Sequence, residues 1–500
     1  MKKLLVMVTA AMAVMMASAE YERVAMAKFA DTASIVKGVS KIGEFTGNQM
    51  IGVMVSSFIT DNEAVKLFGP VREGACSSLI IYANNEDFDD VKVVAFYPVT
   101  LTKKALLDKG TCKEVDGVIK TVAEECNMPE LCLQVSADEK WLVISDCPNM
   151  VKMGCKDLAF AEKPLKRELA TMEFDEQFIA KGIQEIEKDD KSEEDKIAAD
   201  EAIKILKGIG AIKFGLVVDD NGVEICGLVE AKAGSELTKL GTTPLSANSL
   251  DFAPASAIFA NAAAKGAGTT YIDLNELVAL LKKHGIDVSS FFTWIEKNNV
   301  VDMTIDWAKL FAFAKTFDPA KVCENDGCEK FVDEVGKLIK HGATPEMKSS
   351  LKFKGYAKTV ASPAARAKTV LPNIDAKKPI SLQFFSLYSL LNSALPQLME
   401  IIPEAEREGL KPMLAALPPE SKGGIVTALW REGNNFAGVV RISDDELKNL
   451  SVTTSIGAAY VMQKQMELAR QRTAELSAEL SAECEADDDE CEADDDEIVK

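Results

Sequence analysis

One local pattern, found four times, constrains the fold more than any other feature of the sequence. It consists of an apolar strand, a polar turn, a second strand and a short helix opened by Ser, Thr or Asp, at residues 78–110, 130–153, 211–240 and 424–450. Alternating apolar and polar residues on both sides of a turn predict antiparallel β-hairpins. In the third stretch, Asn221-Gly222 suits the positive φ angles of a two-residue hairpin turn.

The third and fourth stretches resemble each other beyond the hairpin itself. Both end in the sequence E-L-x-x-L, at residues 236–240 and 446–450, which lie 210 residues apart. A helical segment precedes each hairpin, at residues 192–208 and 386–416. The pattern therefore indicates an internal duplication. The alternative is that composition alone produced the resemblance, because hairpins followed by helices are common in α+β proteins.

We predict an α+β fold with two similar lobes, residues 20–241 and 242–455, each built from antiparallel hairpins followed by a short capped helix. The boundary falls in residues 241–249, where Gly, Thr, Pro and Ser interrupt the apolar periodicity. In the fourth stretch, Ser443 and Glu446 form the sequence pattern of a capping box. A chain of 500 residues is long enough for two or three domains of this size.

A long C-terminal helix is predicted over residues 456–482, which lack Pro and are rich in Ala, Glu, Leu, Met and Gln. Apolar and small residues recur there at alternating steps of four and three: Met462, Met466, Ala469, Thr473, Leu476 and Leu480. This spacing is the seam of a short coiled coil. An amphipathic helix packed on its own lobe explains the same spacing and is the interpretation that we prefer.

An acidic tail follows at residues 483–500, with the seven-residue repeat E-C-E-A-D-D-D and eleven carboxylates between Glu483 and Glu497. Repulsion between like charges predicts a disordered segment that could attract divalent cations weakly. Cys484 and Cys491 lie seven residues apart, so they could cross-link two copies of the chain. A bridge within one chain and two free thiols are equally compatible with this spacing.

The N-terminus has the order of a secretory signal peptide: Lys2 and Lys3, an apolar run to about Met16, and a small-residue cleavage site ending at Ala19. A retained membrane anchor is the alternative, but the apolar run is short for a bilayer span of about 20 residues. We therefore predict cleavage after Ala19, no later transmembrane segment, and a mature chain that is periplasmic or secreted.

Export makes disulfide bonds the first expectation for most of the eleven cysteines. Cys323 and Cys328 enclose an Asp-Gly turn and form the first candidate pair. Six further candidates allow three bridges whose connectivity stays open: Cys76, Cys112, Cys126, Cys132, Cys147 and Cys155. Structural zinc is the alternative, but the chain has no C-x-x-C pair. We expect Cys226, inside a predicted strand, to be a buried free thiol.

The sequence predicts no catalytic, cofactor-binding or metal-ligating residue. His284 and His341 are the two histidines, and both follow Lys-rich helical sequence next to Gly, as structural residues at helix ends do. Motifs such as G-x-S-x-G and H-E-x-x-H are absent from the sequence. A net charge of −21 disfavours nucleic acid as a partner.

These features predict an exported envelope protein that binds or scaffolds a protein or cell-envelope partner. One alternative is a carboxylate-dependent hydrolase with its site between the lobes, since paired carboxylates suffice for such chemistry. Another alternative is a disulfide-linked oligomer mediated by the tail.

Overall fold

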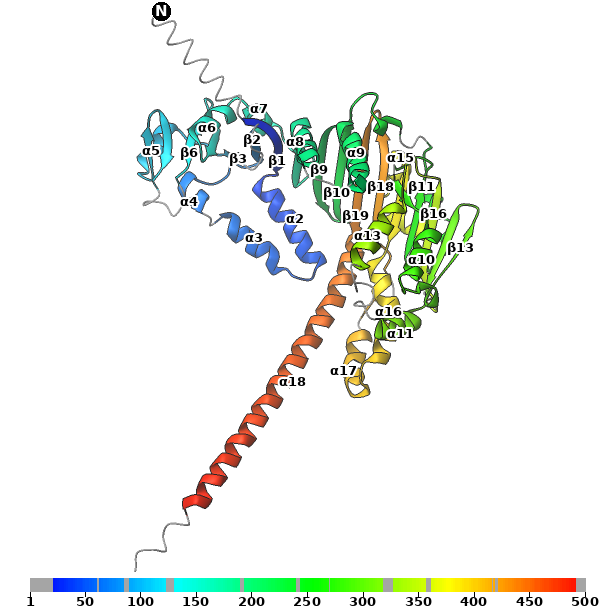
Figure 1. The fold of residues 1–500 in the computed structure, drawn as a ribbon. Coiled ribbons are helices and arrows are strands. Elements are labelled where there is room, and N and C mark those ends of the chain that lie inside the picture. Colours follow the sequence, from blue (N-terminus) through cyan, green and yellow to red (C-terminus); the bar gives the residue numbers. More distant parts are fainter. Residues whose placement is uncertain are drawn as a thin grey trace, which may run out of the picture.

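The computed structural model describes residues 21–60, 63–84, 90–122, 130–188, 193–239, 243–268, 270–317, 327–356, 361–415, 417–418 and 421–491. Its architecture is α+β, as predicted, with one large and mostly antiparallel sheet that helices flank (Figure 1). The predicted signal peptide, residues 1–19, lies outside the described residues, and the first strand begins at Tyr21.

Seventeen strands of the described residues form this sheet, in the spatial order β4-β5-β6-β7-β3-β2-β1-β8-β9-β10-β19-β18-β17-β11-β16-β14-β13. Neighbouring strands are antiparallel except β14 and β16, which are parallel. The bounds are β1 Tyr21–Phe29, β2 Ser77–Asn84, β3 Val91–Pro98, β4 Cys112–Val115, β5 Val118–Thr121, β6 Cys132–Val135, β7 Trp141–Ser145, β8 Ala170–Phe174, β9 Ile209–Asp219, β10 Gly222–Ala231, β11 Phe259–Ala263, β13 Phe292–Lys297, β14 Val300–Ile305, β16 Met347–Phe353, β17 Ser381–Phe385, β18 Ile425–Glu432 and β19 Asn435–Ser443. A separate pair joins β12 (Thr270–Ile272) to β15 (Ile339–His341).

The helices connect these strands and cover the sheet. Their bounds are α2 Thr32–Phe45, α3 Met50–Thr60, α4 Glu63–Phe68, α5 Lys103–Asp108, α6 Pro148–Gly154, α7 Leu158–Glu162, α8 Glu176–Lys188, α9 Glu193–Lys207, α10 Leu274–Lys283, α11 Trp307–Thr316, α13 Gly327–Lys337, α14 Pro363–Val370, α15 Ile374–Lys377, α16 Leu387–Ile401, α17 Glu404–Ala415 and α18 Asp444–Cys491. Short 3₁₀ turns are η1 Glu236–Lys239, η2 Ala247–Leu250 and η3 Val288–Ser290.

All four predicted hairpins are present, as β2–β3, β6–β7, β9–β10 and β18–β19. The turn of the third hairpin differs from the prediction. Asp219 pairs with Gly222, so Asp220 and Asn221 are the two turn residues and Gly222 is the first residue of β10. Gly222 has a φ of 135°, and an added Cβ would lie 2.0 Å from the backbone oxygen of Ile442 on β19. Glycine is therefore required here by the neighbouring strand as well as by backbone conformation.

The sheet continues across the predicted boundary between the lobes. β10 pairs with β19 over eight positions, from Gly222↔Ser443 to Val229↔Phe436. The strands on both sides of this pair belong to one sheet, with β9, β8 and β1 on one side and β18, β17 and β11 on the other.

The two sides repeat the same strand order and registers. The hairpins close at Asp219↔Gly222 and at Glu432↔Asn435, so matching positions lie 213 residues apart. The next strands pair as Ala170↔Leu216 on one side and as Ser381↔Leu429 on the other. Two helices join these strands in each case, α8 and α9 between β8 and β9, and α16 and α17 between β17 and β18.

Separate apolar clusters stabilise the two sides. On one side, α6 and α7 cover residues such as Ile80, Val94 and Val143. On the other side, α14 and η2 cover residues such as Leu382 and Val426. Burial of such side chains contributes roughly 1.5–3 kcal/mol each, so each half has its own source of stability.

The C-terminal helix α18 begins at Asp444, twelve residues before its predicted start. Ser443 Oγ accepts a hydrogen bond from Glu446 N at 3.1 Å, which is one half of the predicted capping box. The other half does not form, because the Glu446 carboxylate instead accepts from Tyr388 N at 2.8 Å and from Ser421 Oγ at 2.8 Å. Three acidic residues in the first turn also favour a helix start at this point.

The far part of α18 leaves the body of the molecule (Figure 1). From Val461 to Ala474 every described side chain is exposed except that of Lys464, which is half-buried. The expectation that this helix packs on its own lobe therefore applies to its first turns only. The helix also extends over the first copy of the acidic repeat, for which disorder was predicted. Ala and Glu are good helix formers and continue the helix there. Residues 492–500 lie outside the described residues.

Candidate functional site

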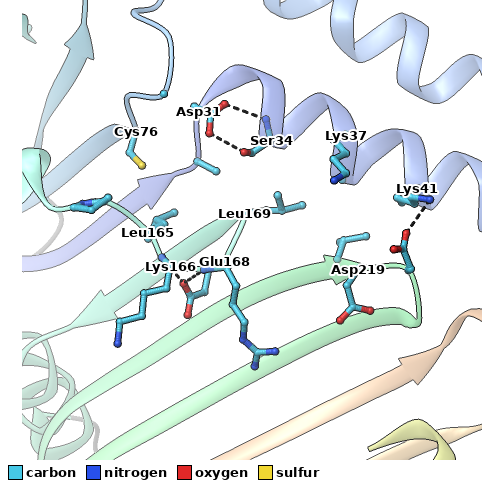
Figure 2. Close-up of a pocket in the computed structure, with 17 residues that line it drawn as sticks. Asp31, Ser34, Lys37, Lys41, Cys76, Leu165, Lys166, Glu168, Leu169 and Asp219 are labelled. Atoms are coloured by element: carbon cyan, nitrogen blue, oxygen red, sulfur yellow. Dashed lines mark hydrogen bonds and ion pairs between the residues drawn. The ribbon is translucent and has the colours of Figure 1, made fainter.

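A cavity of about 370 Å³, which we call the charged cavity, lies in the first half of the chain. Its walls are the first turns of α2, the loop 164–169, the turn between β9 and β10, and Gly74 with Cys76. Four basic and four acidic side chains line it: Lys37, Lys41, Lys166, Arg167, Asp31, Glu168, Asp219 and Asp220. Figure 2 shows Lys37 and Lys41 on the side of α2 that faces the strand carrying Asp219.

Asp31 is occupied as the N-cap of α2. Its carboxylate accepts hydrogen bonds from Ser34 Oγ at 2.7 Å and from Ser34 N at 3.1 Å (Figure 2). The bond from the Ser34 hydroxyl lowers the pKa of Asp31 below its ordinary value. This carboxylate therefore stays ionised and fixes the start of the helix.

Glu168 is held by the backbone of its own loop. Its carboxylate accepts from Lys166 N and from Arg167 N, both at 3.1 Å. Burial raises the pKa of Glu168, but the backbone N–H groups outweigh this effect, so the net pKa lies below the ordinary value. The loop is thereby closed into a turn that presents the side chains of residues 166 and 167.

Asp220, in the β9–β10 turn, pairs with Lys41 of α2 at 2.9 Å. The hydrogen bond from Lys41 lowers the pKa of Asp220, and the same contact raises the pKa of Lys41. Lys41 also pairs with Glu44 at 3.1 Å. These contacts join α2 to the central hairpin and define one end of the charged cavity.

Asp219 and Arg167 belong to an ion-pair network beneath the charged cavity. Arg441 Nη2 lies 2.6 Å from Asp219 Oδ1, and Arg441 Nη1 lies 2.7 Å from Glu224 Oε2. Arg167 pairs with the other oxygen of Glu224. Glu224 and Arg441 are neighbours on β10 and β19. Two guanidinium groups and two carboxylates therefore neutralise each other at the junction of the two halves.

Lys37 and Lys166 differ from the other charged groups of the charged cavity, because neither forms an ion pair within the part of the chain that the structure describes. Each of the four carboxylates already has hydrogen-bonding or cationic partners. The charged groups without an ion-pair partner are therefore two ammonium groups on separate walls, Lys37 on α2 and Lys166 on the loop 164–169, and the Lys166 side chain extends away from α2 (Figure 2). An anionic ligand suits this arrangement.

A buried lysine positions the segment that leads into this loop. The Lys28 ammonium, on β1, donates to the backbone oxygens of Phe160 and Lys163 and lies 4.4 Å from the centre of the Phe160 ring. Burial lowers the pKa of Lys28. The two carbonyl oxygens compensate part of the cost of burying this group.

The other half of the chain has the same backbone contacts at the corresponding place. Leu169 N donates to Leu216 O at 2.7 Å, and Ile380 N donates to Leu429 O at 2.7 Å. The neighbouring bond from Ala30 N to Leu169 O also recurs, from Ala264 N to Ile380 O. There, however, the surroundings are an apolar cluster that includes Ala264, Ile380, Phe436, Leu237 and Leu245. One backbone arrangement thus carries charged groups in the first half and apolar groups in the second.

Two smaller cavities lie close to the charged cavity. One, of about 190 Å³, shares Gly74, Cys76 and Pro164 with it. The other, of about 280 Å³, lies over β8, β9 and β10 and includes Cys226 and Lys213. The residues that line these three cavities all lie between Met26 and Leu228. The cavities therefore belong to the first half and do not lie between the predicted lobes.

Five of the eight cysteines predicted to form disulfides are described. Four of them are free thiols in this structure, Cys76, Cys132, Cys147 and Cys155, and Cys112 is buried. Cys132, Cys147 and Cys155 contribute to one apolar cluster, and burial raises the pKa of Cys132 and Cys155. Cys126 and Cys323 lie outside the described residues, as does the side chain of Cys328 in α13. The predicted bridges therefore stay predictions. Cys226 is a half-buried free thiol whose Sγ lies 3.5 Å from Gly215 O.

The remaining sequence-based expectations concern a histidine at a helix end, groups that could bind a metal ion, membrane-spanning helices and the acidic repeat. His284 ends α10, and its Nε2 lies 2.8 Å from Glu334 Oε2. Within the described residues, no group of three His, Cys, Asp or Glu side chains is placed to hold a metal ion. No helix in the same part of the chain is long and apolar enough to cross a membrane. The side chains of the acidic repeat are not among those described.

Comparison with known proteins adds no assignment to this geometry, because no family model, curated protein or solved structure matches the chain.

Sequence reasoning missed the charged cavity and its ion-pair network. The residues come from five segments, near 31–41, 74–76, 164–169, 219–224 and 441. The pairing of β1 with β8 and of β8 with β9 brings the cavity segments together, and the pairing of β10 with β19 adds Arg441. One signal was present. Glu224 and Arg441 each stand between apolar residues inside predicted strands, and charged residues in such positions are seldom buried without a partner.

Proposed function

We propose that this chain is an exported binding module whose first half binds a small organic anion in the charged cavity. The observation that carries the proposal is the unequal use of charge around this cavity. All four carboxylates are held by the protein, whereas Lys37 and Lys166 have no ion-pair partner among the described residues. Carboxylate or phosphate groups are the natural ligands of such ammonium groups.

The proposed ligand is small and anionic for two further reasons. A volume of about 370 Å³ is within the range of small-molecule sites. The chain as a whole has a net charge of −21, whereas two lysines of this cavity have no ion-pair partner among the described residues. Local positive charge inside an acidic protein favours an anion at that place only.

The predicted internal duplication is part of this proposal. The repeated registers of β1-β8-β9-β10 and β11-β17-β18-β19 support two similar lobes that share one sheet. In that interpretation, the second lobe kept an apolar core where the first lobe acquired the charged cavity. The presence of charged groups in the first lobe, where the second lobe has an apolar cluster, supports a binding function for the first lobe.

Export is also part of the proposal. Cleavage after Ala19 would remove a segment that precedes β1, and β1 is paired on both edges, with β2 and β8. The mature chain would thus keep its complete sheet in the periplasm or outside the cell.

Binding explains the charged cavity better than carboxylate catalysis does. A general acid of the glycosidase type needs a carboxyl group whose pKa is raised. The pKa values of Asp31, Glu168 and Asp220 are all lowered by their hydrogen bonds and ion pairs. These groups are therefore suited to stay ionised and to hold the walls of the cavity.

The test is a ligand titration on the mature chain, with inorganic phosphate, citrate and succinate as probes. We expect at least one probe to bind in isothermal titration calorimetry and to raise the melting temperature. The double variant Lys37→Gln/Lys166→Gln should lose about tenfold or more in affinity, since each charge-assisted hydrogen bond contributes about 1.5–3 kcal/mol when fully formed. The control is Lys297→Gln, an exposed lysine on β13, which should bind as the parent does. Binding that is equal in the double variant, or no binding of any probe, would overturn the proposal.

A further inference from the structure

The outer part of α18, residues 461–474, is exposed at every described side chain except that of Lys464. Near its base, the Lys448 ammonium lies 5.7 Å from the centre of the Phe45 ring, and Ser451 Oγ donates to Thr46 O. Beyond Val461 the helix projects away from the body (Figure 1). An unsupported helix is marginal in water, because packing of an apolar face supplies most helical stability. A partner that covers the exposed apolar side chains would therefore stabilise the projecting segment.

Large apolar side chains of this segment are exposed. Met462 is 62% exposed, Met466 is 55% exposed and Leu468 is 56% exposed. The two methionines belong to a seam with alternating steps of three and four, and they stand at its centre. The seam positions are Val452, Ser455, Ala459, Met462, Met466, Ala469, Thr473, Leu476 and Leu480.

We propose that α18 pairs with α18 of a second copy of this chain as an antiparallel coiled coil, with Met462 of each copy packed against Met466 of the other. In this register Ala459 lies opposite Ala469 of the second copy, and Val452 lies opposite Leu476. The overlap from residue 452 to residue 476 covers about three heptads, which is enough for a short coiled coil. The inference does not depend on the charged cavity.

Charge decides the antiparallel direction. The same spacing continues into the acidic repeat, where Glu483, Asp487 and Glu490 occupy the next seam positions. In a parallel pair, each of these acidic residues would meet the same residue of the second copy in the interface. Like charges at such positions are destabilising. An antiparallel pair places the two acidic repeats at opposite ends of the interface. Arg470 and Arg472, which flank the seam, then lie near Ile456 and Ala458 of the second copy.

A second copy fits this surface better than a lipid bilayer does. Helices that lie on membranes are rich in Lys and Arg on their polar face, whereas α18 leads into eleven carboxylates. The seam is also self-complementary about residue 464, as an interface with two-fold symmetry requires. Because each copy contributes the same seam, formation of the dimer covers the exposed methionines of both copies.

The first test measures the molar mass of the mature chain by light scattering during size-exclusion chromatography. We expect a dimer, and we expect Met466→Glu to weaken it by about 100-fold or more, because two carboxylates enter the apolar interface. Leu468→Glu is the matched control: it makes the same kind of change on the same helix, at an exposed position outside the seam. Circular dichroism of both variants checks that the fold is kept. A parent chain that is monomeric at every concentration, or equal loss in both variants, would overturn the proposal.

The second test determines the direction of pairing. Two variants, Ala459→Cys and Ala469→Cys, are prepared with Cys484→Ser and Cys491→Ser, and one of them carries a size tag. After mixing and oxidation, an antiparallel pair cross-links one variant to the other, whereas a parallel pair cross-links each variant to itself. Self-cross-linking, or a monomer that sediments with phosphatidylcholine vesicles, would contradict the antiparallel dimer. A dimer that persists after Cys484→Ser and Cys491→Ser also separates this interface from a disulfide-linked tail.

Discussion

Glu224 and Arg441 face each other across the pairing of β10 with β19, and their Oε2 and Nη1 atoms lie 2.7 Å apart. Their side chains are 4% and 7% exposed. One residue comes from each half of the chain, so this ion pair lies at the junction of the halves. Each buried charge depends on the other, with Arg167 and Asp219 completing the network.

We expect Arg441→Met to reduce the free energy of unfolding by about 3–5 kcal/mol, because it leaves the Glu224 carboxylate buried beside a single arginine. The double variant Arg441→Met/Glu224→Gln should recover a large part of this loss, since it removes both charges. Urea unfolding monitored by fluorescence and circular dichroism measures both changes. A loss below about 1 kcal/mol for the single variant would contradict a structural role for the pair.

Gly222 should be intolerant of a side chain. The Cβ of Gly222→Ala would meet the Ile442 backbone oxygen at 2.0 Å, and the residue has a positive φ of 135°. We expect a loss of about 2–4 kcal/mol, because either β10 must move from β19 or the turn must change. Thermal and urea unfolding of the variant measure the loss.

Gly433 is the matched control for this change. It lies in the corresponding turn of the other hairpin, with a φ of 65° and nothing within 4 Å of an added Cβ. Gly433→Ala should therefore cost only the backbone strain, about 1 kcal/mol. Equal losses in the two variants would show that backbone strain, and not contact with β19, determines the effect at residue 222.

Glu446 should be necessary for the junction of α18 with the body. Its carboxylate is fully buried and accepts from Tyr388 N at 2.8 Å, Ser421 Oγ at 2.8 Å and Ser386 Oγ at 3.2 Å. Glu446→Ala leaves these donors unpaired, so we expect a loss of about 3 kcal/mol or more in the free energy of unfolding. Glu467→Ala, on the exposed part of the same helix, should change it little. Comparable losses in both variants would refute this role.

The parts of the fold that depend on neighbouring residues could be predicted from the sequence. All four hairpins were found, because turn residues and alternating apolar positions lie within one short stretch. The start of α18 was misplaced because the capping residue Ser443 also ends β19, so strand and helix signals meet at one residue. The predicted turn, Asn221-Gly222, lies one residue after the observed turn, Asp220-Asn221. The sequence pattern was misleading because Gly222 is required by contact with Ile442, which is distant in sequence.

The charged cavity could not be predicted, because its residues become neighbours only through long-range pairing. Lys41 and Asp220 are separated by 179 positions in the chain, and no local pattern relates α2 to the β9–β10 turn. The alternative of a carboxylate site between the lobes stays a prediction. At the junction of the halves, one continuous sheet carries the buried Glu224–Arg441 pair.

The contact between Glu334 and the end of α10 should make stability depend on pH in the acidic range. The hydrogen bond from Lys283, followed by that from His284, lowers the pKa of Glu334 from 4.5 to about 2. A carboxyl group with a lowered pKa in the folded state stabilises the protein above its unfolded pKa, and this contribution is lost as the pH falls from about 4.5 towards 2. Glu334→Gln should thus lower the free energy of unfolding at pH 7, and its difference from the parent should shrink steadily between pH 4.5 and pH 2. Glu296→Gln, an exposed residue on β13, provides the control. Urea unfolding at a series of pH values measures the difference, and a difference that stays constant over this range would exclude the proposed linkage.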